Sequence, residues 1–121
     1  MRIARCLTVT VSMALLAVAG PAFAATGTIT AEPNPCRVEV GKLHCTTYLS
    51  WSTEGVKDAR VYVKREGRER SPEREFAIGH NRQKVPADWI GEGTRYLFTL
   101  YDFSTGGKGA ALASVTVTST K

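Results

Sequence analysis

The sequence predicts an all-β protein that folds as a two-sheet sandwich. Short runs rich in Val, Thr, Tyr and Phe recur at intervals of roughly ten residues, and Gly, Pro, Asn and Asp separate them. Within these runs apolar and polar side chains alternate, which is typical of strands that bury one face. Beyond the first 24 residues, the chain has little of the apolar spacing that an amphipathic helix requires.

Those first 24 residues are predicted to be a cleaved signal peptide. Arg2 and Arg5 form a positive amino-terminal region, Leu7–Ala19 is mostly apolar, and Ala22-Phe23-Ala24 has the small-x-small pattern of a cleavage site. The apolar run is shorter and more interrupted than the ~20 residues that span a bilayer, so we expect no membrane anchor.

Cleavage leaves one domain, residues 25–121, in the periplasm or outside the cell. Two of the chain's 16 basic residues are lost with the signal, so the remaining ones exceed the 11 acidic residues only slightly. A small positive charge suits solubility and gives no indication of a nucleic-acid partner. We expect a monomer without a cofactor or a metal ion.

Proline and glycine separate the first elements of the domain. A first strand is expected at Thr26–Glu32, and Pro33-Asn34-Pro35 stops it. A short extended piece follows at Arg37–Val40, and Gly41-Lys42 turns it into a second strand at Leu43–Ser52.

The later strands are separated by charged or glycine-rich segments. They are expected at Arg60–Arg65, Glu73–Ile78, Gln83–Ile90, Arg95–Phe103 and Leu112–Thr118. Pro86 lacks an amide N–H, which favours an edge strand or a bulge for the run that contains it. Thr105–Gly109 is expected to be the flexible hairpin loop before the last strand.

The alternation assigns one face of each strand to the core. The inward set is Trp51, Val61, Val63, Ile90, Tyr96, Phe98, Leu100, Val115 and Val117. Four strands with an apolar inner face can make the core that two packed sheets need. In this register Phe98 points into the core and Leu97 away from it, and a shift of one residue would reverse both.

The two cysteines of the cleaved chain, Cys36 and Cys45, are predicted to form a disulfide. Export places them in an oxidising compartment, and the short loop that they close is worth about 2.5–3 kcal/mol in the chain-entropy account. A zinc site is disfavoured, because only His44 and His80 could add ligands and His44 is adjacent to Cys45.

Segments along nearly the whole domain carry a family resemblance. They are Pro33–Cys36, Cys45–Thr47, Leu49–Ser52, Ala59–Val63, Trp89–Ile90, Gly93–Tyr101 and Leu112–Val117. Together they resemble a fibronectin type III or immunoglobulin-like domain of the kind found in bacterial secreted and cell-surface proteins.

The resemblance implies a seven-stranded sandwich of two sheets, with Trp51 in the core. It also implies a tyrosine corner, in which the hydroxyl of Tyr96 bonds to nearby backbone. Ile90 and Thr94 match the pattern of that corner, whereas Glu92 stands where proline is usual. The resemblance says little about function, because such sandwiches have many unrelated activities.

The residues give little support for catalysis. The chain has no Gly-x-Ser-x-Gly motif, phosphate-binding loop or His-Glu-x-x-His motif. Glu73 and Glu75 alternate as a carboxylate pair would, but Arg70 and Arg74 beside them favour a solvated edge strand. His80 lies in an expected turn with no nucleophile beside it. We expect a protein that is not an enzyme.

The most charged segment, Lys64–Arg74, has two interpretations. Its alternating signs are those of a solvated hairpin that protects a sheet edge from aggregation. Joined by Arg82 and Lys84, it would instead form a cationic rim for anionic glycans or cell-envelope polymers. The interleaved glutamates weaken the field and favour the first interpretation.

An outward set of aromatic and basic side chains is the candidate binding face. If the strands that carry Tyr62 and Tyr101 are neighbours, as the resemblance implies, their outward side chains form an amphipathic strip. Its members are Tyr62, Leu97 and Tyr101, with Arg60, Lys64 and Arg95 on its flanks and Trp89 as a further aromatic. The strip is either cross-strand packing, worth ~0.2–1 kcal/mol per pair, or a contact surface for a protein or a sugar.

Three functions remain open at this point. The first is a secreted, non-catalytic Ig-like domain that binds, adheres or spaces through protein contacts. The second is a carbohydrate- or envelope-binding module that uses Tyr62 and Tyr101, or Trp89. The third is a small inhibitor of a secreted hydrolase that acts through Arg65–Arg74 or Gly79–Lys84.

Overall fold

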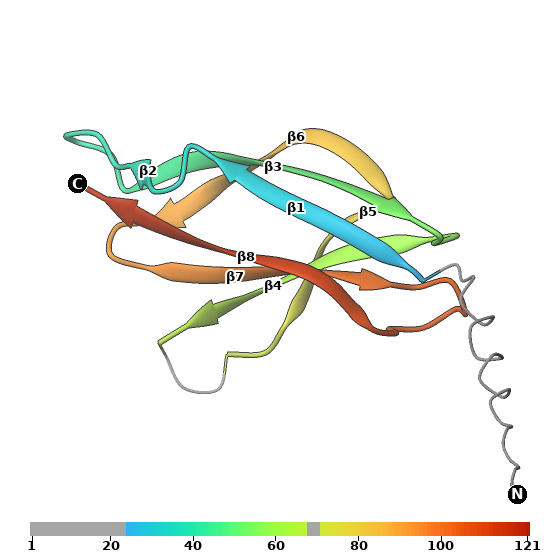
Figure 1. The fold of residues 1–121 in the computed structure, drawn as a ribbon. Helices are drawn as coiled ribbons and strands as arrows, with labels where there is room; N and C mark the ends of the chain where they lie inside the picture. Colours follow the sequence, from blue (N-terminus) through green and yellow to red (C-terminus); the bar gives the residue numbers. More distant parts are fainter. Residues whose placement is uncertain (1–23, 68–70) are drawn as a thin grey trace, which may run out of the picture.

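The computed structural model describes residues 24–67 and 71–121, and over these ranges the chain is all-β (Figure 1). The predicted signal peptide falls almost wholly on residues 1–23, outside the described ranges, and so do residues 68–70 of the charged segment. No helix in the described part of the chain is long and apolar enough to cross a membrane.

The described residues form eight strands in chain order. They are β1 (Thr26–Glu32), β2 (Cys36–Arg37), β3 (His44–Glu54), β4 (Ala59–Glu66), β5 (Arg74–Ile78), β6 (Asn81–Gly91), β7 (Arg95–Asp102) and β8 (Ala111–Thr120). The prediction of an all-β fold is confirmed. The expected bounds agree within two residues at every strand except β2.

The strands build two sheets, which pack as the layers of a sandwich (Figure 1). One sheet has the order β1-β3-β6 and the other β2-β8-β7-β4-β5. All pairings are antiparallel except the short parallel one between β2 and β8. Pro86 lies on β6, at the edge of the smaller sheet, and the β3–β6 pairing contains register shifts. Both features fit the missing N–H of proline.

The extended piece predicted at Arg37–Val40 is shorter than expected. The amide of Lys42 donates a hydrogen bond of 2.9 Å to the carbonyl of Glu39, and Gly41 has a φ of 84°. These two features close a tight turn, because glycine tolerates the left-handed backbone that the turn needs. Val40 consequently lies at the tip of the turn and is fully exposed, whereas Val38 is buried.

The core lies between the two sheets and matches most of the predicted inward set. Trp51, Val61, Val63, Ile90, Phe98, Leu100 and Val117 are buried, together with Leu49 and Cys45. Phe98 is fully buried while Leu97 is only half-buried, so the predicted register is confirmed.

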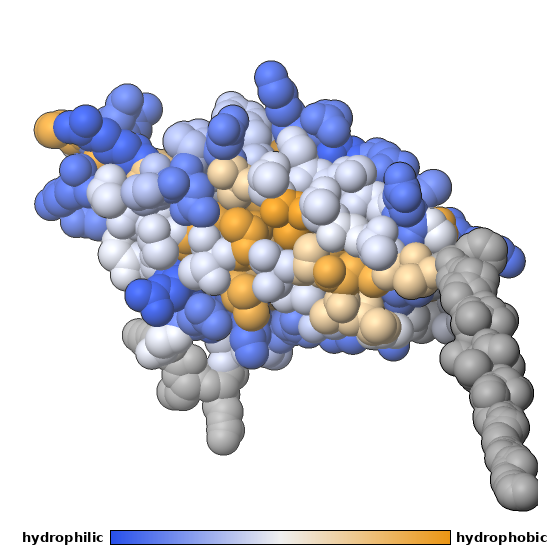
Figure 2. Space-filling view, in the orientation of Figure 1, coloured by the Kyte–Doolittle hydropathy of each residue, from blue (hydrophilic) through white to orange (hydrophobic). Residues whose placement is uncertain are grey.

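Tyr96 and Val115 were also predicted to be buried, but both are half-buried against the core. Tyr96 is the second residue of β7. Its ring packs edge-on against Trp89, with the two ring centroids 5.0 Å apart. Val115 lies on β8, in the larger sheet. β1 is the edge strand of the smaller sheet, and it forms no hydrogen-bonded ladder with β8. Figure 2 shows apolar residues gathered between β1 and β8, where the sandwich has this open side.

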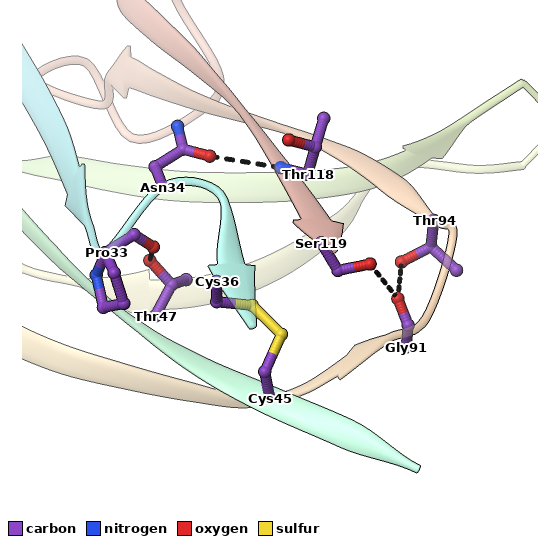
Figure 3. The surroundings of a disulfide bond; sticks show 9 residues. All are labelled: Pro33, Asn34, Cys36, Cys45, Thr47, Gly91, Thr94, Thr118 and Ser119. Atoms are coloured by element: carbon purple, nitrogen blue, oxygen red, sulfur yellow. Dashed lines mark hydrogen bonds between the residues drawn. A yellow bond between two sulfur atoms is a disulfide. The ribbon is translucent and has the colours of Figure 1, made fainter. Parts of the chain in front are cut away.

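The predicted disulfide between Cys36 and Cys45 is present and joins the two layers (Figure 3). Cys36 belongs to β2 in the larger sheet and Cys45 to β3 in the smaller one, with their Cα atoms 5.8 Å apart. Next to the disulfide, the side chain of Asn34 forms two hydrogen bonds with the backbone of β8. Its side chain donates to the carbonyl of Thr116 at 2.8 Å and accepts from the amide of Thr118 at 3.2 Å.

Two hydroxyl groups hold the turn between β6 and β7, near the place where the resemblance implied a tyrosine corner. The carbonyl of Gly91 accepts hydrogen bonds of 2.6 Å from the hydroxyls of both Thr94 and Ser119 (Figure 3). Thr94 therefore closes the turn, and Ser119 ties it to β8. The Tyr96 ring packs against Trp89.

Candidate functional site

The outward side chains of β4 and β7 come together on the larger sheet, as the candidate binding face required. The two strands are antiparallel neighbours, with Arg60 opposite Tyr101 and Lys64 opposite Leu97. Tyr62 lies between them on the same side, because side chains alternate along a strand. We call this set the tyrosine face; it consists of Arg60, Tyr62, Lys64, Leu97 and Tyr101.

Three aromatic rings form a continuous row on the tyrosine face and at its end. The rings of Tyr62 and Tyr101 meet edge to face, with centroids 5.7 Å apart and planes at 86°. Tyr62 also stacks on Phe103 at a centroid distance of 5.9 Å, with the planes only 10° apart. The guanidinium carbon of Arg60 lies 4.6 Å from the centroid of Phe103. Such contacts add to the stability of the face beyond plain burial.

Lys108 reaches this row from the loop between β7 and β8. Its ammonium nitrogen Nζ lies 4.5 Å from the centroid of the Tyr62 ring and 4.7 Å from that of Tyr101. The stem of the loop is closed by two backbone hydrogen bonds, from Gly109 to Asp102 at 2.8 Å and from Asp102 to Ala110 at 3.0 Å. This closure directs Lys108 back over the sheet.

Glu73 completes the cluster from the segment before β5. Its Oε2 accepts a hydrogen bond of 2.7 Å from the hydroxyl of Tyr101, and its Oε1 accepts one of 2.7 Å from Nζ of Lys108. Glu73 had been expected to be a solvated edge charge, but its side chain is only 20% exposed. β5 is an edge strand, as predicted; Glu73 differs because it turns inward to these two partners.

The hydrogen bonds at Glu73 shift two pKa values in opposite directions. Burial raises the pKa of Glu73, but the hydrogen bonds from Lys108 and Tyr101 outweigh it and hold the pKa below its ordinary value. Burial, together with donation to the Glu73 carboxylate, raises the pKa of Tyr101 to about 12. At neutral pH Glu73 is therefore a carboxylate and Tyr101 a neutral phenol.

Arg60 is held at the other end of the row. Its guanidinium pairs with Glu75 at 3.2 Å and with Asp58 at 3.7 Å while it covers Phe103. Its Nε is buried and has no hydrogen-bond partner among the described residues. The guanidinium is thus fixed by two carboxylates and a ring, which fits the planar geometry of arginine.

Two residues of the candidate face lie apart from the cluster. Arg95 is exposed at the end of the β4–β7 pairing, opposite Glu66. Trp89 belongs to the smaller sheet and packs between the layers, with centroid distances of 5.0 Å to Tyr96, 6.0 Å to Phe98 and 6.3 Å to Phe76.

Trp89 instead lines an open cavity of about 660 Å³ at the edge of the sandwich. We call it the edge cavity. Its aromatic wall is formed by Phe76, Trp89 and Tyr96. Its charged lining consists of three basic residues, Lys64, Arg65 and Arg74, and one acidic residue, Glu75. Part of the charged segment Lys64–Arg74 thus does gather at one place. Lys84 does not join it, because it lies beside Tyr48 and Ser50 on the smaller sheet.

Sequence reasoning missed three members of the site, namely Glu73, Phe103 and Lys108. Phe103 could have been predicted. It lies two residues after Tyr101 in a strand that was expected to reach residue 103, so alternation places both side chains on the same face. Lys108 is the one charged residue of the glycine-rich loop, which could have marked it. The sequence also did not reveal that Val40 and Leu43, on either side of the turn at Gly41, are exposed apolar residues, with exposed fractions of 101% and 78%.

The site is a cluster of charged groups and aromatic rings. In the described ranges no group of three or more His, Cys, Asp or Glu side chains is arranged to hold a metal ion. The rings, cations and carboxylates are paired with one another, which presents a surface of mixed charge and aromatic character.

Comparison with protein families, with curated proteins and with solved structures finds no match to this chain.

Proposed function

We propose that this chain is an exported, non-catalytic binding domain that contacts a partner protein through the tyrosine face. The observation that carries the proposal is the register of β4 and β7, which gathers two tyrosines, a leucine and two cations on one sheet surface. Tyrosine and arginine are among the residues that are enriched at the energetically important positions of protein interfaces.

The proposal includes an immunoglobulin or fibronectin III type of sandwich. Its support is the strand order, in which β1, β3 and β6 face a sheet of β8, β7, β4 and β5, and β2 is a short addition to β8. The buried Trp51 on β3 gives further support.

Export is supported by the sequence of residues 1–24 and by the disulfide, which is typical of an oxidising compartment.

The test is recovery of partners from cell-envelope extracts by the immobilised protein. A Tyr62→Ser, Tyr101→Ser double variant is compared with the parent and with Tyr48→Ser, a control on the smaller sheet where the tyrosine is 44% exposed. We expect the parent and the control to retain the same protein and the double variant to lose it. Circular dichroism verifies that all three are folded. Identical recovery by the double variant, or no recovery by the parent, would contradict the proposal.

A second candidate function is glycan binding at the edge cavity. It is favoured by the aromatic wall that includes Trp89, because sugar rings stack on such surfaces, and by Arg65 and Arg74, which suit an acidic sugar. The test is a glycan array probed with the parent, with Arg74→Glu and with the double tyrosine variant. Signal that Arg74→Glu removes and the tyrosine variant retains would favour the cavity over the tyrosine face.

A further inference from the structure

We propose that Tyr62, Tyr101 and Glu73 form an ammonium-binding cage, that Lys108 occupies it in the free protein, and that a lysine side chain of the partner protein replaces Lys108 on binding. The inference rests on the proposed function, because it names the chemical group that the tyrosine face would recognise. We call the three residues the aromatic cage.

The geometry of the aromatic cage is that of a cation site. Two rings at 86° to each other present their faces to one ammonium, at 4.5 and 4.7 Å from the ring centroids. These distances lie within the ~6 Å over which a cation is attracted to an aromatic face. The carboxylate of Glu73 adds the opposite charge at 2.7 Å. Together they bind a positive group from three sides.

Glu73 determines which ammonium the cage prefers. Its Oε1 accepts a hydrogen bond from Nζ, so a bound group with an N–H to donate gains this hydrogen bond in addition to the attraction of charge and rings. A primary ammonium, such as the end of a lysine side chain, can form this hydrogen bond, and a quaternary ammonium cannot. The lowered pKa of Glu73 keeps this acceptor charged at neutral pH.

Lys108 is held in a way that permits exchange. Its side chain is 41% exposed, so an incoming group can reach the cage from solvent. Gly106 and Gly107 precede it, and a Cβ at either position would meet no other atom within 4 Å, so this part of the loop has room to move. The anchored stem at Gly109 keeps Lys108 near the cage as a tethered competitor.

The test uses n-butylammonium, which reproduces the end of a lysine side chain, as the probe. Its binding is followed by the NMR shifts of the Tyr62 and Tyr101 ring protons in the parent and in Lys108→Ala. We expect saturable shifts in the variant, with an affinity about tenfold higher than in the parent, since the variant lacks a competing group that one exposed ion pair and two cation–π contacts hold in the cage. Lys108→Ser provides a second variant with an open cage.

Three controls locate the effect. Lys42→Ala removes an exposed lysine far from the face and is expected to behave as the parent does. Glu73→Gln, added to Lys108→Ala, is expected to weaken binding of the probe. Tetramethylammonium, which has no N–H, is expected to bind the open cage more weakly than n-butylammonium.

Several results would overturn the cage. They are the absence of saturable shifts in both Lys108 variants, equal affinity in the variants and the parent, and equal binding of tetramethylammonium. These results are separable from the proposed function. If the tyrosine variants lose a partner while the open cage binds no amine, the interface stands and the cage is refuted. If the amine binds but partner recovery is unchanged, the ammonium site stands, while the protein interface and the exchange of Lys108 for a partner lysine are refuted.

Discussion

Glu73 holds two different parts of the molecule with its two oxygens. One accepts from the hydroxyl of Tyr101 on β7, and the other from Lys108 in the loop before β8. A charged acceptor gives stronger hydrogen bonds than a neutral one. Because the carboxylate is mostly buried and has both partners, its removal should affect the ring and the loop together.

The first prediction concerns the ionisation of Tyr101. In Glu73→Gln the neighbouring negative charge is lost, so the pKa of Tyr101 should fall from about 12 toward its ordinary value of 10.0. The measurement is an ultraviolet titration of phenolate formation. Glu75→Gln, which changes a carboxylate paired with Arg60, is the matched control and should leave the titration unchanged.

The same shift fixes the direction of a pH effect on stability. The folded pKa of Tyr101 is raised, so its stabilising contribution is complete below pH 10 and is lost as the pH rises through about 12. The folded pKa of Glu73 is lowered, so its contribution is present above the ordinary value of 4.5 and is lost as the pH falls through the folded pKa. The stability difference between the parent and Glu73→Gln should therefore vanish in acid; a difference that persists there would contradict the role of the carboxylate.

Single residues of the site differ in how well the sequence could predict them. Tyr62, Leu97 and Tyr101 were predictable, because strict alternation fixes the side of a strand on which each lies. Glu73 and Lys108 were not, since their contacts join residues 28 and 35 positions apart through segments without regular structure. Such contacts depend on the conformation of the segments outside the strands, and the alternation of apolar and polar residues does not predict that conformation.

At the scale of the elements, β7 is the strand on which both the core and the site depend. It has neighbours on both sides, β4 and β8, and its inward residues Phe98 and Leu100 are fully buried. Its outward residues Leu97 and Tyr101 belong to the tyrosine face. One strand therefore links the packing of the sandwich to the candidate interface.

The second prediction compares adjacent residues of β7. Phe98→Ala should lower the free energy of unfolding by about 3–5 kcal/mol, because it empties a fully buried site. Leu97→Ala should lower it by only about 1 kcal/mol, since this side chain is half-buried on the outer face. Chemical denaturation measures both values. Equal losses would mean that the assignment of inward and outward faces is incorrect.

Elements that bury one face were predictable from alternation, and the irregular ones were not. β1, β4 and β7 have clear patterns and nearly the expected bounds. A short extended piece was predicted at Arg37–Val40, but the turn at Gly41 follows and β2 ends at Arg37. On β6, Lys84 has a φ of 53° and its amide bonds to the hydroxyl of Ser50, which belongs to a bulge that alternation does not reveal.

At the scale of the whole molecule, the disulfide joins the sheets at one end of the sandwich. It connects β2 with β3, next to the Asn34 side chain that bonds to β8. A small domain has a limited core, so one covalent link between its layers contributes a substantial part of its stability.

The third prediction follows from the length of the loop that this disulfide closes, a separation of nine residues. The Cys36→Ser, Cys45→Ser double variant should lose about 2–4 kcal/mol of unfolding free energy, because its unfolded chain is less constrained. Reduction of the parent should produce a similar loss in denaturant titrations. An unchanged midpoint in both cases would show that the link does not stabilise the fold.

Site-specific photocrosslinking tests the central claim, that the tyrosine face contacts a partner protein, most directly. Thr116 is exposed on β8 opposite Leu97, so Thr116→p-benzoyl-L-phenylalanine places a crosslinker at this face without disturbing the core. Tyr48→p-benzoyl-L-phenylalanine places the same group on the smaller sheet as the control. We predict that irradiation in envelope extracts links a defined protein to position 116 and not to position 48, and that the Tyr62→Ser, Tyr101→Ser changes remove the product. Equal crosslinking at both positions, or none at position 116, would contradict the account.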